Sequence, residues 1–159
     1  MEINYIIREA ETRDSRFIFD LSNEKIVRDN SIKKRKIDWE EHIKWFNKKL
    51  NDNNYEFFVI YDEHNNFIGQ IRYEISDGKA EVSISITKNF RGEKLASKIL
   101  ADSATILFRN REKIERVFAY IRKENIASLR AFEEAGYIFE KSLNINNENY
   151  KLYILSKEE

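Results

Sequence analysis

The chain has 159 residues, 42% of them hydrophobic, and this length and composition predict one compact domain over 1–159. Its 28 Lys and Arg residues balance 28 Asp and Glu residues, which argues against a protein held on nucleic acid by bulk charge. The absence of cysteine excludes disulfides, thiolate metal ligands and a cysteine nucleophile, so any acyl transfer in this chain must be direct.

The N-terminal part predicts a strand and a helix followed by a polar stretch. Residues 3–8 are typical of a short strand, and Thr12 is placed to cap a helix that ends near Asn23. The polar residues 22–37 indicate a loop. Its basic run, 33–36, is either a solvated surface or a patch that attracts an anionic substrate.

A second helix is predicted over 39–50. Apolar side chains recur there every three or four residues, at Trp39, Ile43, Phe46 and Leu50. Asp38 and Glu41 have the spacing of a capping box. His42 and Trp45 border the buried face, so we expect packing roles for them rather than catalysis.

The middle of the chain predicts three strands in a meander. Two apolar runs, 57–61 and 67–75, form a hairpin around a polar turn. After Asp77 and Gly78, residues 81–86 alternate polar and apolar side chains, which is the period of a third strand.

The remaining sequence predicts two helices and three strands. Residues 93–109 form a long helix and 117–122 a strand, and Asn125 caps a helix that stops at Gly136. Two closing strands complete the chain, at 137–145 and 149–156. Together these elements predict an α/β fold with a mixed, largely antiparallel seven-stranded sheet flanked by about four helices.

Two motifs at matched spacing carry the strongest functional signal. The first reads Arg91-Gly92-Glu93-Lys94-Leu95-Ala96, and the second reads Asn125-x-x-Ser128-x-x-x-Phe132-x-x-x-Gly136-Tyr137. A strand, a short loop and a helix in this order recur at phosphate sites, because the helix N-terminus presents free backbone N–H groups. On these motifs and the order of its elements, the chain resembles the GNAT superfamily of acyl-CoA-dependent N-acetyltransferases.

The resemblance implies acetyl-CoA as the co-substrate and no metal. The residues implied to bind acetyl-CoA lie in both motifs and on the preceding strand: Ser85, Ile86, Arg91, Gly92, Glu93, Lys94, Leu95, Ala96, Asn125, Ser128 and Phe132. By its residues alone, the first motif also fits a basic turn before an amphipathic helix without any ligand. Asn125 alone also fits a helix cap.

Two positions depart from the family pattern. Lys94 stands where the motif has its central glycine, so its side chain must point outward, and it either weakens cofactor binding or adds a charge contact to a phosphate. Phe132 stands where most members carry a tyrosine that protonates the departing thiolate. Tyr137 and Tyr120 are candidate substitutes, with core packing as the alternative role for each.

Glu81 is the candidate general base. An ammonium must lose a proton before it attacks a thioester, and a carboxylate is the usual acceptor of that proton. Alternation places Glu81 on one face of its strand with Ser83 and Ser85, and the preceding strand has a similar polar line: Gln70, Arg72 and Glu74. The two lines indicate a wet cleft, or else a solvent-exposed sheet face on which Arg72 pairs with Glu81.

A finer resemblance concerns the acceptor. Stretches within 23–46 and 69–85 resemble the branch that acetylates amino-sugar nucleotides in pseudaminic acid-type pathways. This branch implies a small-molecule amine acceptor bound by Arg28, Gln70 and Arg72, with Arg28 meeting a substrate phosphate.

Other functions stay open. Polyamine and ribosomal-protein N-terminal acetyltransferases share the later segment of the chain, and a non-catalytic acyl-CoA-binding domain is a further alternative. Arg28 also fits a surface ion pair. No apolar run is long enough to span a bilayer, and the first residues lack the layout of a signal peptide, so we expect a cytoplasmic protein without a membrane or nucleic-acid partner. A homodimer is an open alternative.

Overall fold

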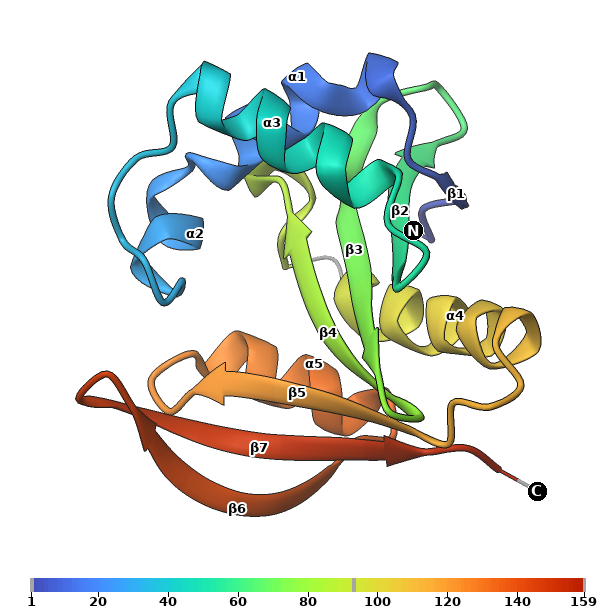
Figure 1. The fold of residues 1–159 in the computed structure, drawn as a ribbon, viewed down its shortest axis with the longest axis vertical. Helices are drawn as coiled ribbons and strands as arrows, with labels where there is room; N and C mark the ends of the chain where they lie inside the picture. The colour runs from blue at the N-terminus through green and yellow to red at the C-terminus, as the bar shows by residue number, and fades with distance from the viewer. Residues whose placement is uncertain (1, 93, 159) are drawn as a thin grey trace.

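The computed structural model describes residues 2–92 and 94–158, and it confirms the predicted α/β fold (Figure 1). The seven strands are β1 (Tyr5–Glu9), β2 (Tyr55–Asp62), β3 (Phe67–Ser76), β4 (Lys79–Ile86), β5 (Arg116–Arg122), β6 (Ile138–Ile145) and β7 (Glu148–Ser156). The α-helices of the described residues are α1 (Ser15–Ser22), α2 (Lys25–Asp29), α3 (Trp39–Leu50), α4 (Leu95–Asn110) and α5 (Ile126–Glu134). Two 3-10 helices, η1 (Thr12–Asp14) and η2 (Lys88–Phe90), precede α1 and α4.

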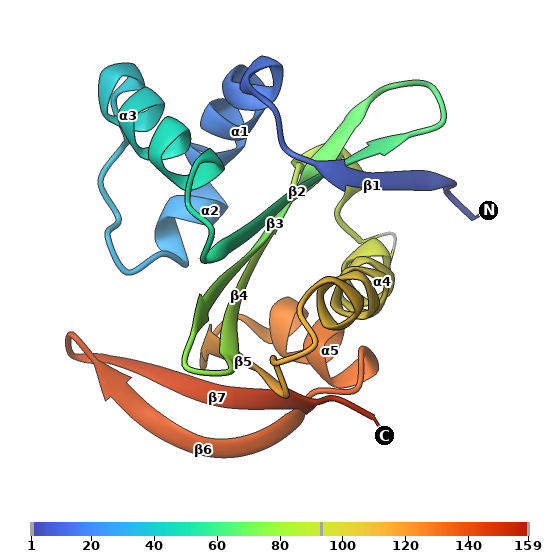
Figure 2. The same cartoon turned by 45° about the vertical axis from the view of Figure 1, so that its right-hand side comes forward.

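The sheet divides where β4 meets β5. The strand order is β1-β2-β3-β4-β5-β7-β6, and β4 and β5 are parallel while all other neighbours are antiparallel. The parallel pairing joins only Lys79–Glu81 to Arg116–Phe118. Beyond these residues the two strands separate, and the sheet has two arms (Figure 1, Figure 2). The separation frees backbone groups that would otherwise pair within the sheet.

A two-residue turn fixes the register of β3 against β4. Asp77 and Gly78 have φ values of 50° and 77°, and positive φ at both positions is the geometry that Asp-Gly hairpins favour. The turn pairs Ser76 with Lys79 and consequently Glu74 with Glu81. Directly paired residues project from the same face of a sheet, so the register brings these two carboxylates together.

Helices cover both faces of the arm formed by β1 to β4 (Figure 2). One core cluster lies between β2 and the helices α1 and α3: Ile18, Phe46, Phe57 and Val59. The alternate β2 residues Phe58 and Ile60 belong to the larger cluster, which α4 and α5 complete. The apolar run of β2 is therefore buried on both sides. Truncating Phe46 of α3, which is fully buried in the first cluster, to alanine would lower the free energy of unfolding by about 3–5 kcal/mol.

The predicted cap at Thr12 is wrong. Thr12 begins the 3-10 turn, and the turn is closed by Asp14, whose Oδ2 accepts the Glu11 N–H at 2.8 Å. The same carboxylate forms an ion pair with Arg8 at 2.7 Å. Asp14 is fully buried, and these partners satisfy its carboxylate. It stands at the N-cap of α1, but its side chain makes no capping hydrogen bond to that helix.

The start of α3 also differs from the prediction. Asp38 precedes the helix, but its side chain accepts no capping hydrogen bond. The expected partner, Glu41, pairs with Arg35 at 2.9 Å instead, because a guanidinium competes strongly for a carboxylate. The polar stretch 22–37 contains the short helix α2 where a loop is predicted.

Candidate active site

Two cavities meet at the split between β4 and β5. The first, of about 680 Å³, lies between the separated strands and the first turns of α4 and α5. The second, of about 840 Å³, lies between the β3–β4 hairpin, the segment between α2 and α3, and the β6–β7 hairpin. The cavities share five lining residues: Asn30, Ser31, Val82, Ser83 and Tyr120. Ligands in the two cavities would therefore meet at the middle of β4.

The first cavity gathers the residues predicted to bind the cofactor. Its lining includes Ser85, Ile86, Arg91, Gly92, Lys94, Leu95, Ala96, Asn125, Ser128 and Phe132. Glu93, from the same prediction, lies outside the described residues. The fold thus brings two segments that are distant in sequence, 85–96 and 125–132, to one cavity.

The backbone before α4 is left-handed at two positions. Gly92 has a φ of 82°, and Lys94, directly before the helix, has φ 60° and ψ 20°. Lys94 therefore adopts the conformation that glycine favours, at the position of the missing glycine. Its side chain is exposed, as an outward-pointing lysine should be. The free N–H groups of the first turn of α4 follow directly and suit an anion.

Arg91 is engaged by a carboxylate. Its guanidinium donates to Glu24, between α1 and α2, and both side chains are half-buried. A phosphate in the first cavity would have to share Arg91 with Glu24.

Asn125 caps α5 as predicted, and two aromatic side chains pack together at the end of the helix. Asn125 Oδ1 accepts the Ser128 N–H at 3.3 Å and so caps the helix. Phe132 is buried with its ring edge-on to Tyr137, the ring centroids 4.9 Å apart. The Tyr137 hydroxyl is buried without a hydrogen-bond partner among the described residues, and burial raises the pKa of Tyr137 well above its usual value. Tyr137 does not line the cavity and is poorly suited to donate a proton into it.

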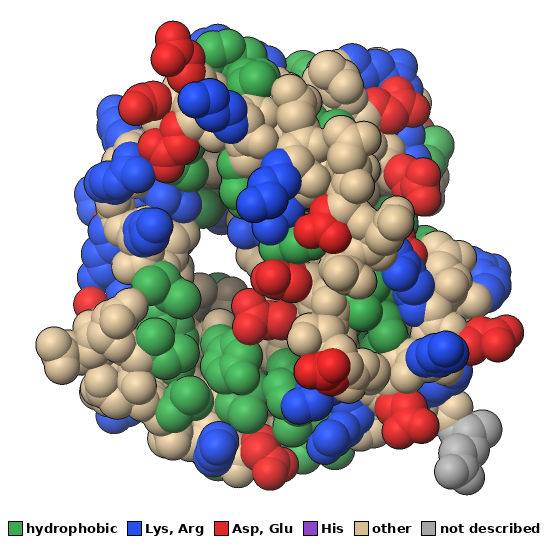
Figure 3. All heavy atoms as spheres, in the orientation of Figure 1, with side chains coloured by type: hydrophobic (Ala, Val, Ile, Leu, Met, Phe, Trp, Pro, Cys, Tyr) green, Lys and Arg blue, Asp and Glu red, His purple; other side chains and the backbone are tan. Residues whose placement is uncertain are grey.

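The second cavity is lined by charges of both signs. The acidic residues are Glu41, Glu74 and Glu81, and the basic residues are Arg28, Lys33, Arg35 and Arg72. Figure 3 shows a hollow on this face, with Lys and Arg side chains along one side and acidic side chains opposite. The cavity can attract a cationic group, an anionic group or a molecule that carries both.

Glu81 lies directly opposite Glu74 at this cavity. Partial desolvation raises the pKa of Glu81 above its usual value, the Glu74 carboxylate raises it further, and Arg72 partly offsets both. A carboxylate with a raised pKa is a better base near neutral pH. The alternative considered above, a cross-strand pair of Arg72 with Glu81, does not form, because the turn at Asp77 sets Arg72 opposite Ser83.

Arg72 lies against an aromatic ring instead. Its guanidinium is 4.9 Å from the centroid of Trp45, and its Nη1 donates to Gln70 Oε1 at 3.2 Å. Gln70 is buried and donates in turn to Ser85 Oγ at 3.3 Å. Of the residues predicted to bind the acceptor, Arg72 and Arg28 line the second cavity. Gln70 supports Arg72 from within the sheet and links it to Ser85 in the first cavity.

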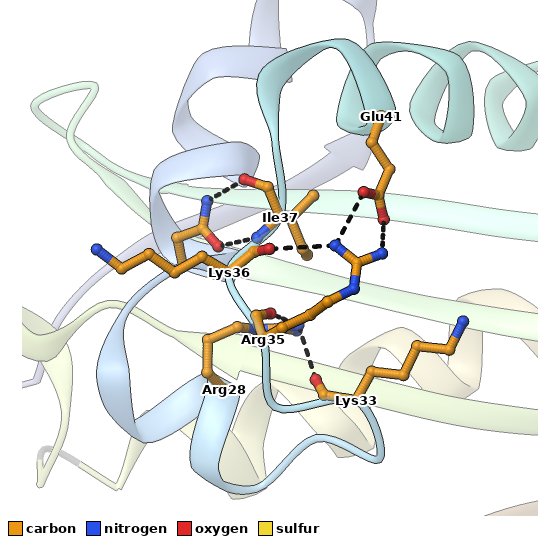
Figure 4. Close-up of polar contacts among 7 residues, drawn as sticks. Arg28, Lys33, Arg35, Lys36, Ile37 and Glu41 are labelled. Atoms are coloured by element: carbon orange, nitrogen blue, oxygen red, sulfur yellow. Dashed lines mark hydrogen bonds and ion pairs between the residues drawn. The ribbon is translucent and has the colours of Figure 1, made fainter.

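Arg28 is bound by its own segment of chain (Figure 4). Its guanidinium donates to four oxygens: Ser22 O at 2.7 Å, Lys33 O at 2.9 Å, Arg35 O at 3.2 Å and Ser31 Oγ at 3.1 Å. It forms no ion pair with a carboxylate of the described residues. Most of the donors that could meet a substrate phosphate are therefore occupied.

His42 is buried under α1. Its Nε2 lies 3.0 Å from Ser15 O, and its ring packs against four aromatic side chains: Phe19, Trp39, Trp45 and Phe46. Burial lowers the pKa of His42, which favours the neutral ring. These contacts agree with the packing role expected for it. His42 and Trp45, both expected only to pack, also line the second cavity.

Neither a metal cluster nor a membrane helix occurs in the described part of the chain. No three His, Cys, Asp or Glu side chains there are grouped so as to hold an ion, and no helix there is both long and apolar enough to cross a bilayer.

Comparison with known proteins identifies relatives over most of the length. Residues 4–138 match the acetyltransferase (GNAT) domain family. One relative, the spermidine N(1)-acetyltransferase of Vibrio cholerae serotype O1, is 27% identical over 150 residues, which cover 90% of this chain and 84% of the relative.

Solved structures share the fold. The Vibrio cholerae spermidine N-acetyltransferase in complex with CoA and spermine matches with a TM-score of 0.86 at 22% identity, covering 96% of this chain and 95% of that chain. A chimera of the Vibrio cholerae enzyme with hSSAT gives a TM-score of 0.83 at 21% identity, with the same coverage of 96% and 95%.

Proposed function

Because this chain belongs to the GNAT acetyltransferase family and is an acyl-CoA-dependent N-acetyltransferase, we propose that it transfers the acetyl group of acetyl-CoA to a primary amine of a polyamine. The Vibrio cholerae relative is a spermidine N(1)-acetyltransferase, and the similar solved structure holds CoA and spermine. These comparisons support the polyamine alternative better than the amino-sugar branch expected from the finer resemblance.

The paired carboxylates of Glu74 and Glu81 carry this proposal. They lie together at the second cavity, which meets the first one at Ser83. A polyamine carries several ammonium groups, and neighbouring carboxylates attract such groups electrostatically. One ammonium can then pair with Glu74 while another gives its proton to Glu81.

In this mechanism the protein aligns the reactants and moves one proton. Acetyl-CoA supplies the activated acetyl group and a thiolate leaving group. Glu81 removes the proton from the acceptor ammonium, directly or through water, and the amine attacks the thioester without an acyl-cysteine step, since the chain has no cysteine. A free β4 backbone N–H near Ser83 is suited to stabilise the oxyanion.

We assign acetyl-CoA to the first cavity. The N–H groups at the start of α4, after Gly92 and Lys94, are suited to its pyrophosphate. The unpaired edge of β4 at Ser85 and Ile86 can bond the pantetheine amides, and Asn125 with Ser128 contributes from α5. The remaining residues of the predicted set, Arg91, Leu95, Ala96 and Phe132, line the same cavity.

Tyr120 is the proton donor that the geometry favours for the thiolate. Of the four polar side chains that line both cavities, it alone has a phenol, which is far more acidic than the hydroxyls of Ser31 and Ser83 or the amide of Asn30. Tyr137 is excluded by its burial outside the cavity, and Phe132 has no proton to give.

One observation favours a second acceptor class, an amine that also carries a phosphate. Arg72 is held in the second cavity by Trp45 and Gln70, and no carboxylate of the described residues forms an ion pair with it. A preorganised guanidinium is suited to phosphate. An amino-sugar nucleotide would meet both Arg72 and Glu81.

An acceptor panel tests the proposal. Purified protein and acetyl-CoA would be given spermidine, spermine, a UDP-amino sugar and a peptide with a free N-terminus, and thiol release would be measured for each. We expect the highest kcat/KM with a polyamine. Turnover of the UDP-amino sugar alone would replace the polyamine with the second class, and acetyl-CoA binding without turnover of any amine would contradict the catalytic assignment.

A further inference from the structure

The segment between α2 and α3 is held in its middle and at its C-terminal end by side chains that bond its backbone (Figure 4). Asn23 donates to Ile37 O at 2.9 Å and accepts the Ile37 N–H at 2.8 Å. Arg28 donates to Lys33 O and Arg35 O. This segment, residues 31–37, is called the acceptor loop below, because most of it lines the second cavity.

A third contact joins the acceptor loop to the far side of the cavity. Lys34 Nζ lies 2.9 Å from Glu148 Oε1, at the start of β7, and the two residues are 114 positions apart. The other carboxylate oxygen of Glu148 accepts Arg122 Nη1 at 2.8 Å. The loop is thereby tied to the β5–β7 arm of the sheet, across the gap between the two arms.

This ion pair lies between two segments that line the second cavity. On one side of it the acceptor loop lines the cavity through Ile32 and Lys33, and on the other side the β6–β7 hairpin lines it through Leu143, Ile145 and Tyr150. Among the described residues, the pair of Lys34 and Glu148 is the one ion pair that joins these two walls.

The two side chains of the contact differ in how firmly they are held, because Glu148 has a second partner in Arg122. Arg122 is 6% exposed, and its Nε and Nη2 have no hydrogen-bond partner among the described residues, so Glu148 is the side-chain partner of the guanidinium through Nη1. Glu148 is therefore the counter-ion of a buried guanidinium and costly to move. Lys34 is half-exposed on a long flexible side chain, so the pair opens on the loop side.

We propose that Lys34 and Glu148 are positioning residues that hold the acceptor loop as a wall of the second cavity. By holding this wall in place they set the affinity for the acceptor. The proposal rests on the proposed function of that cavity. Neither residue lines the cavity or touches the reacting groups. Breaking the pair changes acceptor binding but not acetyl-CoA binding or the chemical step.

The test compares Lys34→Ala with two matched variants. Lys34→Arg keeps the charge, and Lys36→Ala removes a lysine of the same loop that has no ion pair among the described residues and does not line the cavity. For Lys34→Ala we expect acceptor KM to rise about two- to fivefold, the range typical of a half-exposed ion pair, with kcat and the acetyl-CoA Kd unchanged. Lys34→Arg and Lys36→Ala should match the wild type.

Two further readouts separate positioning from general loss of structure. High salt should bring the KM ratio between Lys34→Ala and wild type toward one, because salt screens the intact pair. Amide hydrogen exchange of residues 31–37 should be faster in Lys34→Ala only.

Unchanged exchange, or faster exchange with unchanged acceptor KM, would overturn the proposal. A wild-type protein that acetylates no amine would instead overturn the proposed function and the acceptor role with it, while the exchange comparison would still decide whether the pair holds the loop.

Discussion

Glu74 and Glu81 face each other as directly paired residues of the β3–β4 hairpin. Both line the second cavity. Desolvation raises the pKa of Glu81 and the nearby charge of Glu74 raises it further, because two close carboxylates resist simultaneous ionisation. In the proposed mechanism, this residue pair therefore both attracts a cationic acceptor and raises the pKa of the carboxylate that deprotonates it.

Replacing the base should slow catalysis most at low pH. Glu81→Gln removes the proton acceptor, and we expect kcat/KM to fall about 100-fold near neutral pH, with a smaller loss at high pH where the acceptor amine loses its proton to solvent. Acetyl-CoA affinity should be unchanged by calorimetry. Wild-type rates at every pH would refute the role of Glu81.

Replacing its neighbour should move the pH profile. The wild-type rate should rise through the raised pKa of Glu81, and Glu74→Gln removes one cause of that raised pKa. We therefore expect the rising limb in Glu74→Gln at lower pH than in the wild type. A limb that does not move would show that Glu74 does not act on Glu81.

The same carboxylate should reduce stability at high pH. A carboxyl whose folded pKa is raised binds its proton more tightly in the folded state, so the folded state loses stability as pH rises from the ordinary pKa through the raised one. Glu81→Gln cannot titrate. We expect its Tm to exceed that of the wild type by about 2 °C at most near pH 8, and to equal it near pH 4. A lower Tm for Glu81→Gln at pH 8 would contradict this.

Some of this site follows from the sequence and some does not. A two-residue Asp77-Gly78 turn sets position 76 against 79, and counting outward gives Glu74 opposite Glu81. The alternative pairing of Arg72 with Glu81 ignores that count. The register, and with it the paired carboxylates, was thus predictable from the turn.

The residues predicted to bind the cofactor, Glu93 aside, line one cavity. The role of Arg28, in contrast, was not predictable. Arg28 binds mainly backbone carbonyls, and every residue has a carbonyl, so the sequence contains no sign of such a contact. The split between β4 and β5 has no local signal either, because parallel strands are not joined by a tight turn.

The proton donor can be tested by loss and rescue. Tyr120→Phe should lower kcat about tenfold without changing acetyl-CoA affinity, since a thiolate is a tolerable leaving group but a protonated one departs faster. Adding Phe132→Tyr to that variant places a phenol in the wall of the same cavity and should restore much of the rate. Tyr137→Phe serves as the control and should keep the wild-type rate. Equal rates for Tyr120→Phe and wild type would exclude Tyr120 as the acid.

The cofactor loop can be tested by charge at constant shape. Gly92 has a φ of 82°, and apart from its chain neighbours no heavy atom of the described residues lies within 4 Å of where a Cβ would lie, so backbone strain rather than crowding limits substitution. Asparagine tolerates this backbone, and aspartate has nearly the same shape with a negative charge. We expect Gly92→Asp to bind acetyl-CoA at least tenfold more weakly than Gly92→Asn in calorimetry at low salt. Equal affinities would remove the pyrophosphate from this turn.

Arg72 can decide between the two acceptor classes. Its guanidinium repels a polyamine but would bind a phosphate, so Arg72→Gln should lower the KM for spermidine and raise the KM for a phosphate-bearing amine by roughly tenfold or more. Arg72→Lys keeps the charge but loses the planar fork. It should therefore leave the spermidine KM near the wild-type value while weakening a bidentate phosphate contact. Initial rates would be measured with both acceptors on the wild type, Arg72→Gln and Arg72→Lys. A spermidine KM that falls in Arg72→Gln alone supports a polyamine acceptor. A KM for the phosphorylated amine that rises in both variants supports a phosphate-bearing acceptor.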